Sequence, residues 1–329
     1  MVSLQDIAKE LGISAGFVSK VLSGRLGTST VSPPMRKRIF KKADELGYVP
    51  NRNAIRLFTG KKDALGVFIH PWGVPGADLV FEFLYGASKG LTPTVYQTWL
   101  NIFEEAPEFY RRMTLQQIQQ RVDGLVVGGS TQPWLAPLLR QIAKAGIPLV
   151  TFFEKQYPGI VNVCVDYYQQ GRLPTEHLLV RGCRKIVHIK YFESRHRGYT
   201  DALREAGLSL KPEYIIACDN FGVEEGRSVV RKLLRAKIPF DGIVAESDHQ
   251  ALGAVHELLA RGIRVPEQVR VTGVDDGPIC LTSPVPLTSI TSEAYRMGLL
   301  TVESMMKILA KKPVKSTSLT PRMAIRGSS

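Results

Sequence analysis

From Asp63 onward, short apolar runs rich in Val and Ile alternate with segments of helix length. Strand candidates lie at 65–69, 94–99, 124–127, 147–153, 161–165, 186–189, 214–217, 242–245, 269–274 and 287–290. Helix candidates lie near 78–90, 107–121, 134–145, 168–181, 197–206, 224–236, 248–261 and 295–311. Continuous apolar strands separated by helices are typical of parallel sheets that are covered on both faces. Roughly ten strands exceed what one small doubly wound sheet holds, so we predict an α/β body with two such sheets and a ligand cleft between two lobes.

The first 62 residues follow a different pattern, that of a small all-α unit. One face of the first helix carries apolar residues at helical spacing, namely Leu4, Ile7, Ala8 and Leu11. Capping and stop residues bound the three expected helices: Ser3, Gly12, Ser14, Ser32 with Pro33, and Gly47. Two short helices joined by a glycine-containing turn predict a helix-turn-helix head, whose second helix enters the major groove of DNA.

The positive charge of the chain is concentrated in the same region. Residues 1–62 carry 12 Lys and Arg against 4 Asp and Glu, while the whole chain has a net charge of +13. The basic residues available for phosphate contacts are Lys20, Arg25, Arg36, Lys37, Arg38, Lys41, Lys42, Arg52, Arg56, Lys61 and Lys62. Such a cluster gives affinity for DNA that falls steeply with salt. A solvated basic face is the alternative, but its coincidence with three capped helices favours DNA binding.

Length and composition place further bounds on the protein. A chain of 329 residues is expected to form two or three domains, and 44% hydrophobic residues indicate a folded protein. No apolar run approaches the ~18 residues of a membrane span, and no secretory signal is visible, so we expect a cytoplasmic protein with no membrane partner. The four cysteines are scattered and are expected to be reduced, buried thiols: Cys164, Cys183, Cys218 and Cys280.

The sequence lacks the motifs of an enzyme built on a doubly wound fold. It contains no G-x-G-x-x-G after a strand and no G-x-x-x-x-G-K-[ST], and its G-x-S-x-G match at Gly12 to Gly16 lies between two predicted helices, not at an elbow after a strand. Gly128-Gly129-Ser130 follows a predicted strand, but an ordinary loop is a better interpretation than a phosphate cradle. We therefore predict no catalytic residues, no metal site and no cofactor.

The junction over 50–62 is predicted to be a hinge. Residues 52–57 are long enough for one or two helical turns, which are unstable alone and would form only when a partner holds them. Leu57 is flanked by basic residues, so it either acts as a wedge between base steps in the minor groove or docks on the next domain.

At this point a set of motifs resembles one known family over essentially the whole chain. In the head these motifs are Asp6-Ile7-Ala8, Val18-Ser19-Lys20-Val21-Leu22-Ser23-Gly24 and Leu46-Gly47-Tyr48-Val49-Pro50-Asn51. In the body they include Arg121-Val122-Asp123-Gly124, Arg195-His196-Arg197-Gly198-Tyr199, Gly262-Ile263-Arg264-Val265-Pro266 and Gly273-Val274-Asp275-Asp276. In this order they resemble transcriptional regulators of the lac repressor family.

The resemblance implies a homodimer in which each head reads one half-site of a near-palindromic DNA operator. It also implies a periplasmic-binding-protein-like body that senses a small metabolite, usually a sugar or nucleobase, and a minor-groove role for Leu57. We expect a helix-turn-helix domain at 1–49, a hinge at 50–62 and an effector-binding and dimerisation domain at 63–329. Its first lobe would comprise about 63–164 and 293–318, and its second lobe about 165–292 and 319–329.

The DNA-contacting residues implied by the resemblance are Ser14, Ala15, Gly16, Phe17, Ser19, Lys20, Arg25, Asn51, Ala54 and Leu57. The recognition helix departs from the family pattern at Ala15-Gly16-Phe17, where polar base-reading residues are usual. Ala15 can touch only a thymine methyl group and Gly16 offers no side chain, whereas Lys20 can address guanine. The operator sequence therefore does not follow from the resemblance.

The ligand-binding residues that we expect are Trp72, Tyr167, Arg195, Phe221, Ser247 and Asp275. Arg195 is placed just after a predicted strand end, and its guanidinium offers forked donors to vicinal hydroxyls or a carboxylate. Phe221 matches a family position that stacks on a sugar, although a core role is the alternative. Asp275 ends a predicted strand and can accept hydrogen bonds from hydroxyls. For Ser247-Asp248, a capping role for Asp248 is as plausible as a ligand contact.

These observations predict a DNA-binding transcriptional regulator, more specifically a repressor, that a sugar or sugar derivative controls. Two alternatives stay open, a solute-binding protein without DNA function and a regulator that a partner protein controls. No leucine heptads follow the last helix, so a dimer is expected and not a tail-zippered tetramer.

Overall fold

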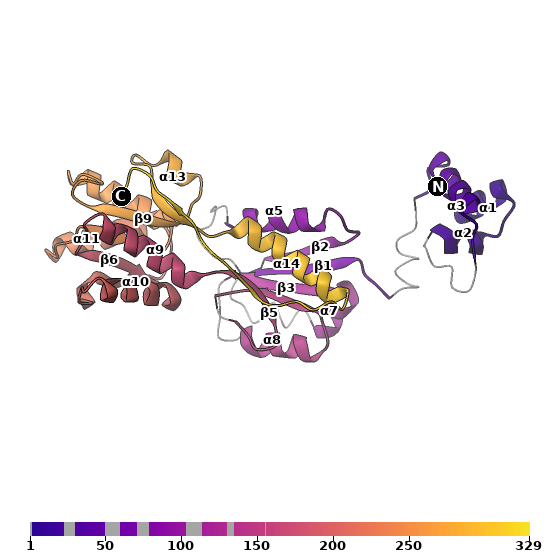
Figure 1. The fold of residues 1–329 in the computed structure, drawn as a ribbon, viewed down its shortest axis with the longest axis horizontal. Coiled ribbons are helices and arrows are strands. Elements are labelled where there is room, and N and C mark those ends of the chain that lie inside the picture. Colours follow the sequence, from indigo (N-terminus) through magenta and orange to yellow (C-terminus); the bar gives the residue numbers. More distant parts are fainter. Residues whose placement is uncertain are drawn as a thin grey trace. The chain divides into compact units, whose positions relative to one another are not determined.

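The computed structural model describes residues 2–22, 30–49, 60–70, 79–102, 114–129, 135–154 and 156–329. The chain divides into two compact units, Met1–Lys61 and Lys62–Ser329, which we call the head and the body (Figure 1). Five of the predicted site residues lie outside the described residues: Arg25, Asn51, Ala54, Leu57 and Trp72.

The described part of the head contains three helices, α1 (Leu4–Leu11), α2 (Ala15–Leu22) and α3 (Pro33–Glu45). Local side-chain contacts explain where they begin and end. The Ser3 hydroxyl accepts from the Asp6 N–H, and the Asp6 carboxylate accepts from the Ser3 N–H, which forms a capping box. Gly12 ends α1 with a φ of 65°, and Ser32 caps α3. The three predicted helices are confirmed.

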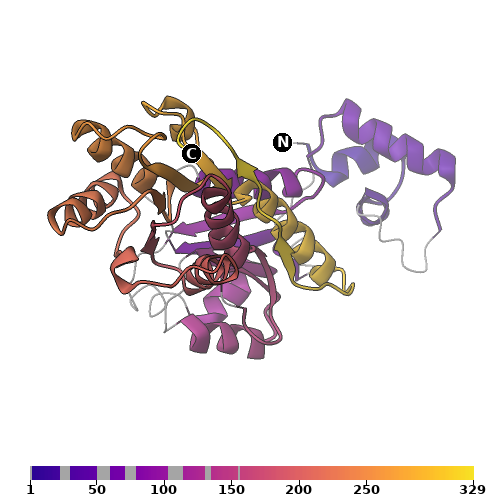
Figure 2. The same cartoon turned by 60° about the vertical axis from the view of Figure 1, so that its left-hand side comes forward.

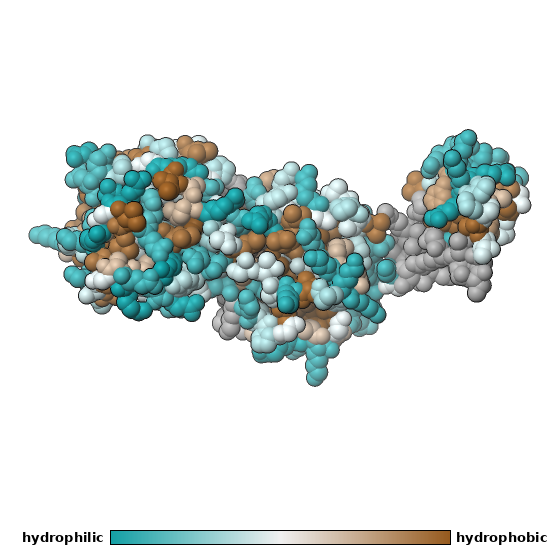
Figure 3. All heavy atoms as spheres, in the orientation of Figure 1, coloured by the Kyte–Doolittle hydropathy of each residue, from teal (hydrophilic) through white to brown (hydrophobic). Residues whose placement is uncertain are grey.

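One small apolar core holds these helices together. Ile7, Val18, Val21 and Ile39 are almost wholly buried, and they come from all three helices. Figure 3 shows hydrophilic side chains over much of the head surface in this view. The head thus has its own core, as expected of a helix-turn-helix domain.

The first lobe of the body is built around one parallel sheet in the order β11-β5-β4-β3-β1-β2. Its strands are β1 (Ala64–His70), β2 (Gln97–Ile102), β3 (Gly124–Gly129), β4 (Leu149–Phe152), β5 (Val161–Val165) and β11 (Thr317–Leu319). Its helices are α5 (Leu79–Leu91), α7 (Leu115–Arg121), α8 (Leu135–Lys144) and α14 (Ala294–Leu309). Figure 1 shows α5 and α14 on one face of the sheet and α8 on the other. Separate apolar clusters fill the two sides.

The second lobe repeats this plan with the order β12-β10-β9-β8-β6-β7. Its strands are β6 (Ile186–Lys190), β7 (Ile215–Ala217), β8 (Gly242–Val244), β9 (Arg270–Asp275), β10 (Thr288–Thr291) and β12 (Met323–Ala324). Its helices are α9 (Tyr167–Val180), α10 (Glu193–Glu205), α11 (Val223–Arg235), α12 (Asp248–Ala260) and α13 (Ile279–Thr282), with a short 3-10 turn at Pro212–Tyr214. The two views in Figures 1 and 2 show helices on both faces of this sheet too. The predicted architecture of two doubly wound sheets is confirmed.

Neighbouring helices approach closely at glycines. A Cβ atom added to Gly86 of α5 would lie 1.9 Å from the Tyr295 carbonyl oxygen of α14. One added to Gly253 of α12 would lie 1.9 Å from the Val223 carbonyl oxygen of α11. Each lobe therefore has a helix pair whose close packing requires the absence of a side chain.

The position of β2 differs from the prediction of 94–99. The Thr94 hydroxyl donates to the Leu91 carbonyl oxygen (2.8 Å) and accepts from the Tyr96 N–H (3.1 Å). This turn occupies the predicted start, so pairing with β1 begins only at Gln97.

Two further predictions were wrong. The helix predicted at 197–206 begins earlier, at Glu193, which places an acid in its first turn where the helix dipole favours it. The prediction also missed β11 and β12, which are too short to show periodicity, and β12 runs antiparallel to β10. Of the helix predicted at 107–121, the described part is α7, which Thr114 caps. The other predicted bounds agree to within about two residues.

The chain crosses between the lobes from β5 to α9, from β10 to α14 and from β11 to β12. Glu293 lies in the second crossing with a φ of 54°. Its carboxylate accepts from Arg296 in α14 (3.1 Å) and from Arg322 in the third crossing (3.1 Å). These contacts join two crossings beside the cleft described below.

All four cysteines are buried free thiols. Among the described residues, no helix is both long and apolar enough to cross a membrane, and no group of metal-ligating side chains has the geometry of a metal site.

Candidate functional site

Helix α2 presents a mixed surface at the positions predicted to read DNA. Ser14, at its start, accepts a hydrogen bond from the Phe17 N–H (3.2 Å) and is exposed, as are Gly16 and Lys20. Ser19 is half-buried. Ala15 and Phe17 are also half-buried, and both pack against the core of the head. Part of the unusual Ala15-Gly16-Phe17 sequence therefore supports the fold of the head.

Exposed basic side chains lie on α3. Arg36, Lys37 and Arg38 are exposed and form no salt bridge with any described carboxylate. Lys41 and Lys42 instead lie 3.7 Å and 2.8 Å from the carboxylate oxygens of Glu45. The α3 surface thus offers uncompensated positive charge to a polyanion.

The body contains a cavity of about 710 Å³ between its lobes. Its walls come from both lobes and from the crossings: Leu79, Glu82, Asp248, His249, Asp275, Asp276, Gly277, Pro278, Ile279, Thr282, Thr291, Ser292, Glu293, Ala294, Tyr295, Arg296 and Arg322. Parallel sheets of this type bind ligands beyond the carboxyl ends of their strands. Asp275, the last residue of β9, occupies this kind of position.

Asp275 is held in an unusual conformation. Its φ is 114°, and Asp276 follows with a φ of 57°, so two consecutive non-glycine residues lie in the left-handed region. Burial raises the pKa of Asp275 well above its ordinary value, as does the neighbouring Asp248 charge, while Arg195 acts in the opposite direction. The carboxyl group of Asp275 thus faces the cavity at a backbone position that costs free energy to maintain.

Asp248 lies behind Asp275 and is almost wholly buried. Its carboxylate accepts from the Gly277 N–H (2.9 Å) and from the Ser289 hydroxyl. Burial raises the pKa of Asp248 to about 6, against the effect of these hydrogen bonds. The cap of α12 is Ser247, whose hydroxyl accepts from the Gln250 N–H (3.1 Å), so the capping role considered for Asp248 belongs to its neighbour.

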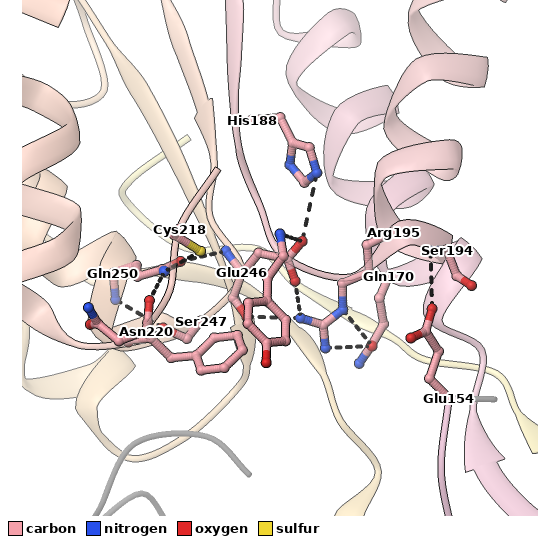
Figure 4. A network of polar contacts seen from close by, with 12 residues as sticks. Glu154, Gln170, His188, Ser194, Arg195, Cys218, Asn220, Glu246, Ser247 and Gln250 are labelled. Carbon is pink, nitrogen blue, oxygen red and sulfur yellow. Dashed lines mark hydrogen bonds and ion pairs between the residues drawn. The ribbon is translucent and has the colours of Figure 1, made fainter. Parts of the chain in front are cut away.

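Arg195 lies in a buried network next to this wall (Figure 4). It is only 6% exposed and lies in the first turn of α10, which begins three residues after the end of β6. Its Nη1 atom donates to the Glu246 carboxylate (2.7 Å) and to the Glu246 carbonyl oxygen (2.9 Å). Its Nε and Nη2 atoms donate to the Gln170 side-chain oxygen at 3.1 Å and 2.9 Å.

Glu246 is the charge partner of Arg195. Burial raises the pKa of the Glu246 carboxyl group, and the Arg195 guanidinium and backbone N–H groups of 191–192 oppose this shift. A distance of 2.7 Å to a group that is always charged is the geometry of an ion pair, so we assign the carboxylate form. His188, 3.7 Å from Glu246, has its pKa lowered to about 3 by burial and is neutral.

Aromatic rings enclose the guanidinium. Arg195 lies 5.1 Å from the Tyr167 ring centre and 4.8 Å from that of Phe192. The Phe221 ring lies 6.0 Å from that of Phe192, and the Phe221 carbonyl oxygen accepts from the Ser247 hydroxyl (2.6 Å). The structure therefore brings Tyr167, Arg195, Phe221 and Ser247 into one cluster, with Asp275 on the adjoining cavity wall.

Sequence reasoning missed two members of this network, Glu246 and Gln170. Glu246 comes just after β8, and the rule that selected Asp275, a polar residue at the carboxyl end of a strand, could have found it. Gln170 lies within α9, and nothing in its local sequence indicates the contact with Arg195. His177 of α9 contacts the Ser329 hydroxyl (2.8 Å).

Known protein families match parts of both the head and the body. Residues 3–51 match the family described as "Bacterial regulatory proteins, lacI family", and residues 175–329 match the "Periplasmic binding protein-like domain". The chain belongs to the LacI family of bacterial regulatory proteins. Relatives of this LacI-family chain include the HTH-type transcriptional regulator GntR of Escherichia coli, 28% identical over 97% of this chain and 94% of that protein. The ribose operon repressor of Halalkalibacterium halodurans is 27% identical over 95% of this chain and 92% of that protein.

Solved structures show the same fold in other LacI-family proteins. The lac repressor dimer bound to operator and the anti-inducer ONPF has a TM-score of 0.82 at 20% identity, covering 99% of this chain and 98% of that one. A complex of the transcriptional regulator CelR with cellobiose has a TM-score of 0.72 at 24% identity, with full coverage of both chains. The match of residues 3–51 to the lacI-family model and the similarity to transcriptional regulators over 97% of the chain identify the protein as a DNA-binding regulator. Its relatives are transcription regulators, which confirms the prediction that it is not an enzyme.

Proposed function

We propose that the chain is a transcriptional repressor that binds operator DNA as a homodimer and releases or binds it in response to a sugar held between its lobes. The cavity between the lobes carries this proposal, because its walls join both lobes with the crossings that connect them. Bacterial DNA lies in the cytoplasm, so we infer that the protein acts there. The predicted domain boundaries and site residues form part of the proposal.

The identities of the relatives support both halves of the proposal. Two of the relatives are named ribose operon repressors, and a structurally similar regulator is in complex with cellobiose. In this chain, Asp275 on the cavity wall can accept hydrogen bonds from sugar hydroxyls, the rings of Tyr167 and Phe221 can pack against a sugar face, and Ser247 holds Phe221 through its hydroxyl.

The coupling between the two sites depends on a change in lobe closure. A ligand that binds one closure state more tightly shifts the protein towards that state. In a dimer this movement would change the spacing of the two hinges and the access of Leu57 to the minor groove. A thousand-fold change in operator affinity requires ~4 kcal/mol of coupling.

The test begins with selection of an operator from a random duplex library by the full-length protein. Fluorescence anisotropy then measures affinity for that duplex with and without neutral sugars. We expect a near-palindromic site and a change in affinity with at least one sugar. Retention of no duplex even at low salt would favour the solute-binding alternative. DNA binding that responds only to an added protein would favour the partner-controlled alternative.

A further inference from the structure

We propose that the effector carries no carboxylate or phosphate group, and that Glu246 is the residue that sets this selectivity. This inference rests on the proposed function, since it concerns the chemistry of the ligand in the same cleft. It follows from the charge partners of the arginines around the cavity.

The guanidinium of Arg195 has almost no donor left for an anionic ligand. An arginine side chain has five N–H groups. The contacts with Glu246 and Gln170 use both N–H groups of Nη1, the single one of Nε and one of those on Nη2. One Nη2 hydrogen remains, so the forked pair of bonds that binds a carboxylate or phosphate cannot form without breaking existing contacts. Glu246 also cancels the positive charge that would attract an anion.

The other described arginines at the cavity are paired too. Arg296 and Arg322 both donate to Glu293 at 3.1 Å. Arg326, behind the wall, lies 2.7 Å from Asp276. An acidic ligand would have to compete with these internal carboxylates.

Three carboxyl groups on the wall, by contrast, have no salt bridge to a described basic residue, namely Glu82 of α5, Asp248 of α12 and Asp275 of β9. Asp275 lies near the Arg195–Glu246 pair, whose net charge is zero. The described wall therefore presents carboxyl oxygens as hydrogen-bond acceptors, beside arginines that are already paired. Hydroxyl and amine groups donate to such acceptors, whereas a carboxylate or phosphate is repelled by them.

Glu246 is a specificity residue because it acts on the ligand through Arg195. An uncharged amide at this position would still accept a hydrogen bond from Nη1 but would leave the guanidinium charge unbalanced. The site would then hold a positive charge that an acidic ligand can use. Gln is close to Glu in size, so the exchange changes charge with little change in packing.

The experiment titrates full-length wild-type protein with a carbohydrate array in which each neutral sugar is paired with its amino, uronate and phosphate counterparts. Thermal shift screens the array, and calorimetry measures the dissociation constants. We expect saturable binding of at least one neutral or amino sugar, with its acidic counterparts at least about a hundredfold weaker, the equivalent of ~2.7 kcal/mol. Equal or tighter binding of an acidic sugar would overturn this inference while leaving sugar sensing intact. Binding of no sugar would instead refute the proposed function, and this inference with it.

The role of Glu246 is tested with Glu246→Gln, which is expected to bind the acidic counterpart at least about tenfold more tightly than wild type. Glu246→Asp keeps the charge and should still reject acids. The same amide exchange at Glu257, which pairs with Arg261 (3.1 Å) and is not part of the cavity wall, is the matched control and should not change the preference. An unchanged preference in folded Glu246→Gln would refute its role. If Glu246→Gln does not fold, the folded Glu246→Asp variant tests the role of Glu246 instead. Binding of acidic sugars by Glu246→Asp, which retains the carboxylate charge, would also refute that role.

Discussion

Positive charge is exposed on the head, whereas in the cleft it is paired with a buried carboxylate. On the head, Arg36, Lys37 and Arg38 are exposed without a salt bridge to a described carboxylate. In the cleft, Arg195 is buried and its charge is cancelled by Glu246 at 2.7 Å. The head is therefore suited to a polyanion that replaces counterions, and the cleft to a ligand without acidic groups. One basic chain can thus bind two chemically different partners because internal carboxylates neutralise one site and not the other.

The largest expected effect is a difference in salt dependence between DNA binding by the head and sugar binding by the cleft. If three to five cations of each head reach phosphates, raising salt from about 50 to about 200 mM should weaken operator binding by about a thousandfold or more. Binding of a neutral sugar should hardly change. Fluorescence anisotropy measures DNA binding and calorimetry measures sugar binding. Similar slopes of log affinity against log salt for the two ligands would contradict the proposed difference between the sites.

Single exchanges on α3 refine this test. Lys37→Ala should reduce the slope of log affinity against log salt by about one for each phosphate that the lysine neutralises in the wild-type complex. The exchange Lys312→Ala, at an exposed position of the body, is the control and should leave the slope unchanged. Equal slopes in all three proteins would exclude Lys37 from the DNA interface.

Removal of Arg195 should have the largest effect on stability. Arg195→Met leaves Glu246 buried without its partner, which is expected to lower the free energy of unfolding by about 3–5 kcal/mol. Arg204→Met is the matched control, because Arg204 pairs with Asp201 at 2.8 Å while 76% exposed, and such surface pairs contribute at most about 1 kcal/mol. Urea unfolding followed by circular dichroism measures both.

A double variant tests whether the destabilisation comes from the unpaired charge. Arg195→Met with Glu246→Leu removes both charges and should recover most of the stability of the wild type. If the double variant were as unstable as Arg195→Met, the packing of the arginine stem against Tyr167 and Phe192 would explain the destabilisation instead of the charge.

The raised pKa of Asp248 predicts a smaller, pH-dependent effect. Its pKa is about 6 in the folded protein against 3.8 ordinarily, so the folded state binds more protons between these values. The free energy of unfolding should therefore fall as pH rises from about 4 to about 6, by up to about 3 kcal/mol from this group. Asp275 acts in the same direction, since its pKa is raised as well.

Asp248→Asn removes this titration while its side-chain oxygen can still accept from Gly277. The difference in unfolding free energy between wild type and this variant should shift in favour of the variant as pH rises through this range. Asp219→Asn, at an exposed position, provides the control. A difference that does not change with pH would show that Asp248 keeps an ordinary pKa.

The contrast between the head and the cleft also explains how far the sequence could predict the structure. The helices of the head depend on contacts over three or four residues, such as Ser3 with Asp6, and these are visible in the sequence. The two sheets followed from a repeated pattern along the chain. The partners of Arg195 are 25 and 51 residues away, at Gln170 and Glu246. No local signal encodes such a pairing, so the sequence identified the arginine but not the state of its charge.

The smallest expected effect concerns Gly16, at an exposed position of α2 where an added Cβ has no atom within 4 Å. Gly16→Ala should stabilise the head by about 0.5–1 kcal/mol, because alanine loses less backbone freedom in a helix. Hydrogen exchange of head amides in the full-length protein measures this gain. The matched Gly12→Ala is expected to destabilise the head by about 1–2 kcal/mol, since Gly12 has a φ of 65°.

The same Gly16→Ala variant tests the DNA interface. If Gly16 lies against a base pair in the operator, Gly16→Ala will bind the selected duplex more weakly despite the more stable head. Unchanged or tighter binding would place Gly16 outside the DNA interface and leave Lys20 of α2 and the preceding Ser14 as exposed candidates for base contacts.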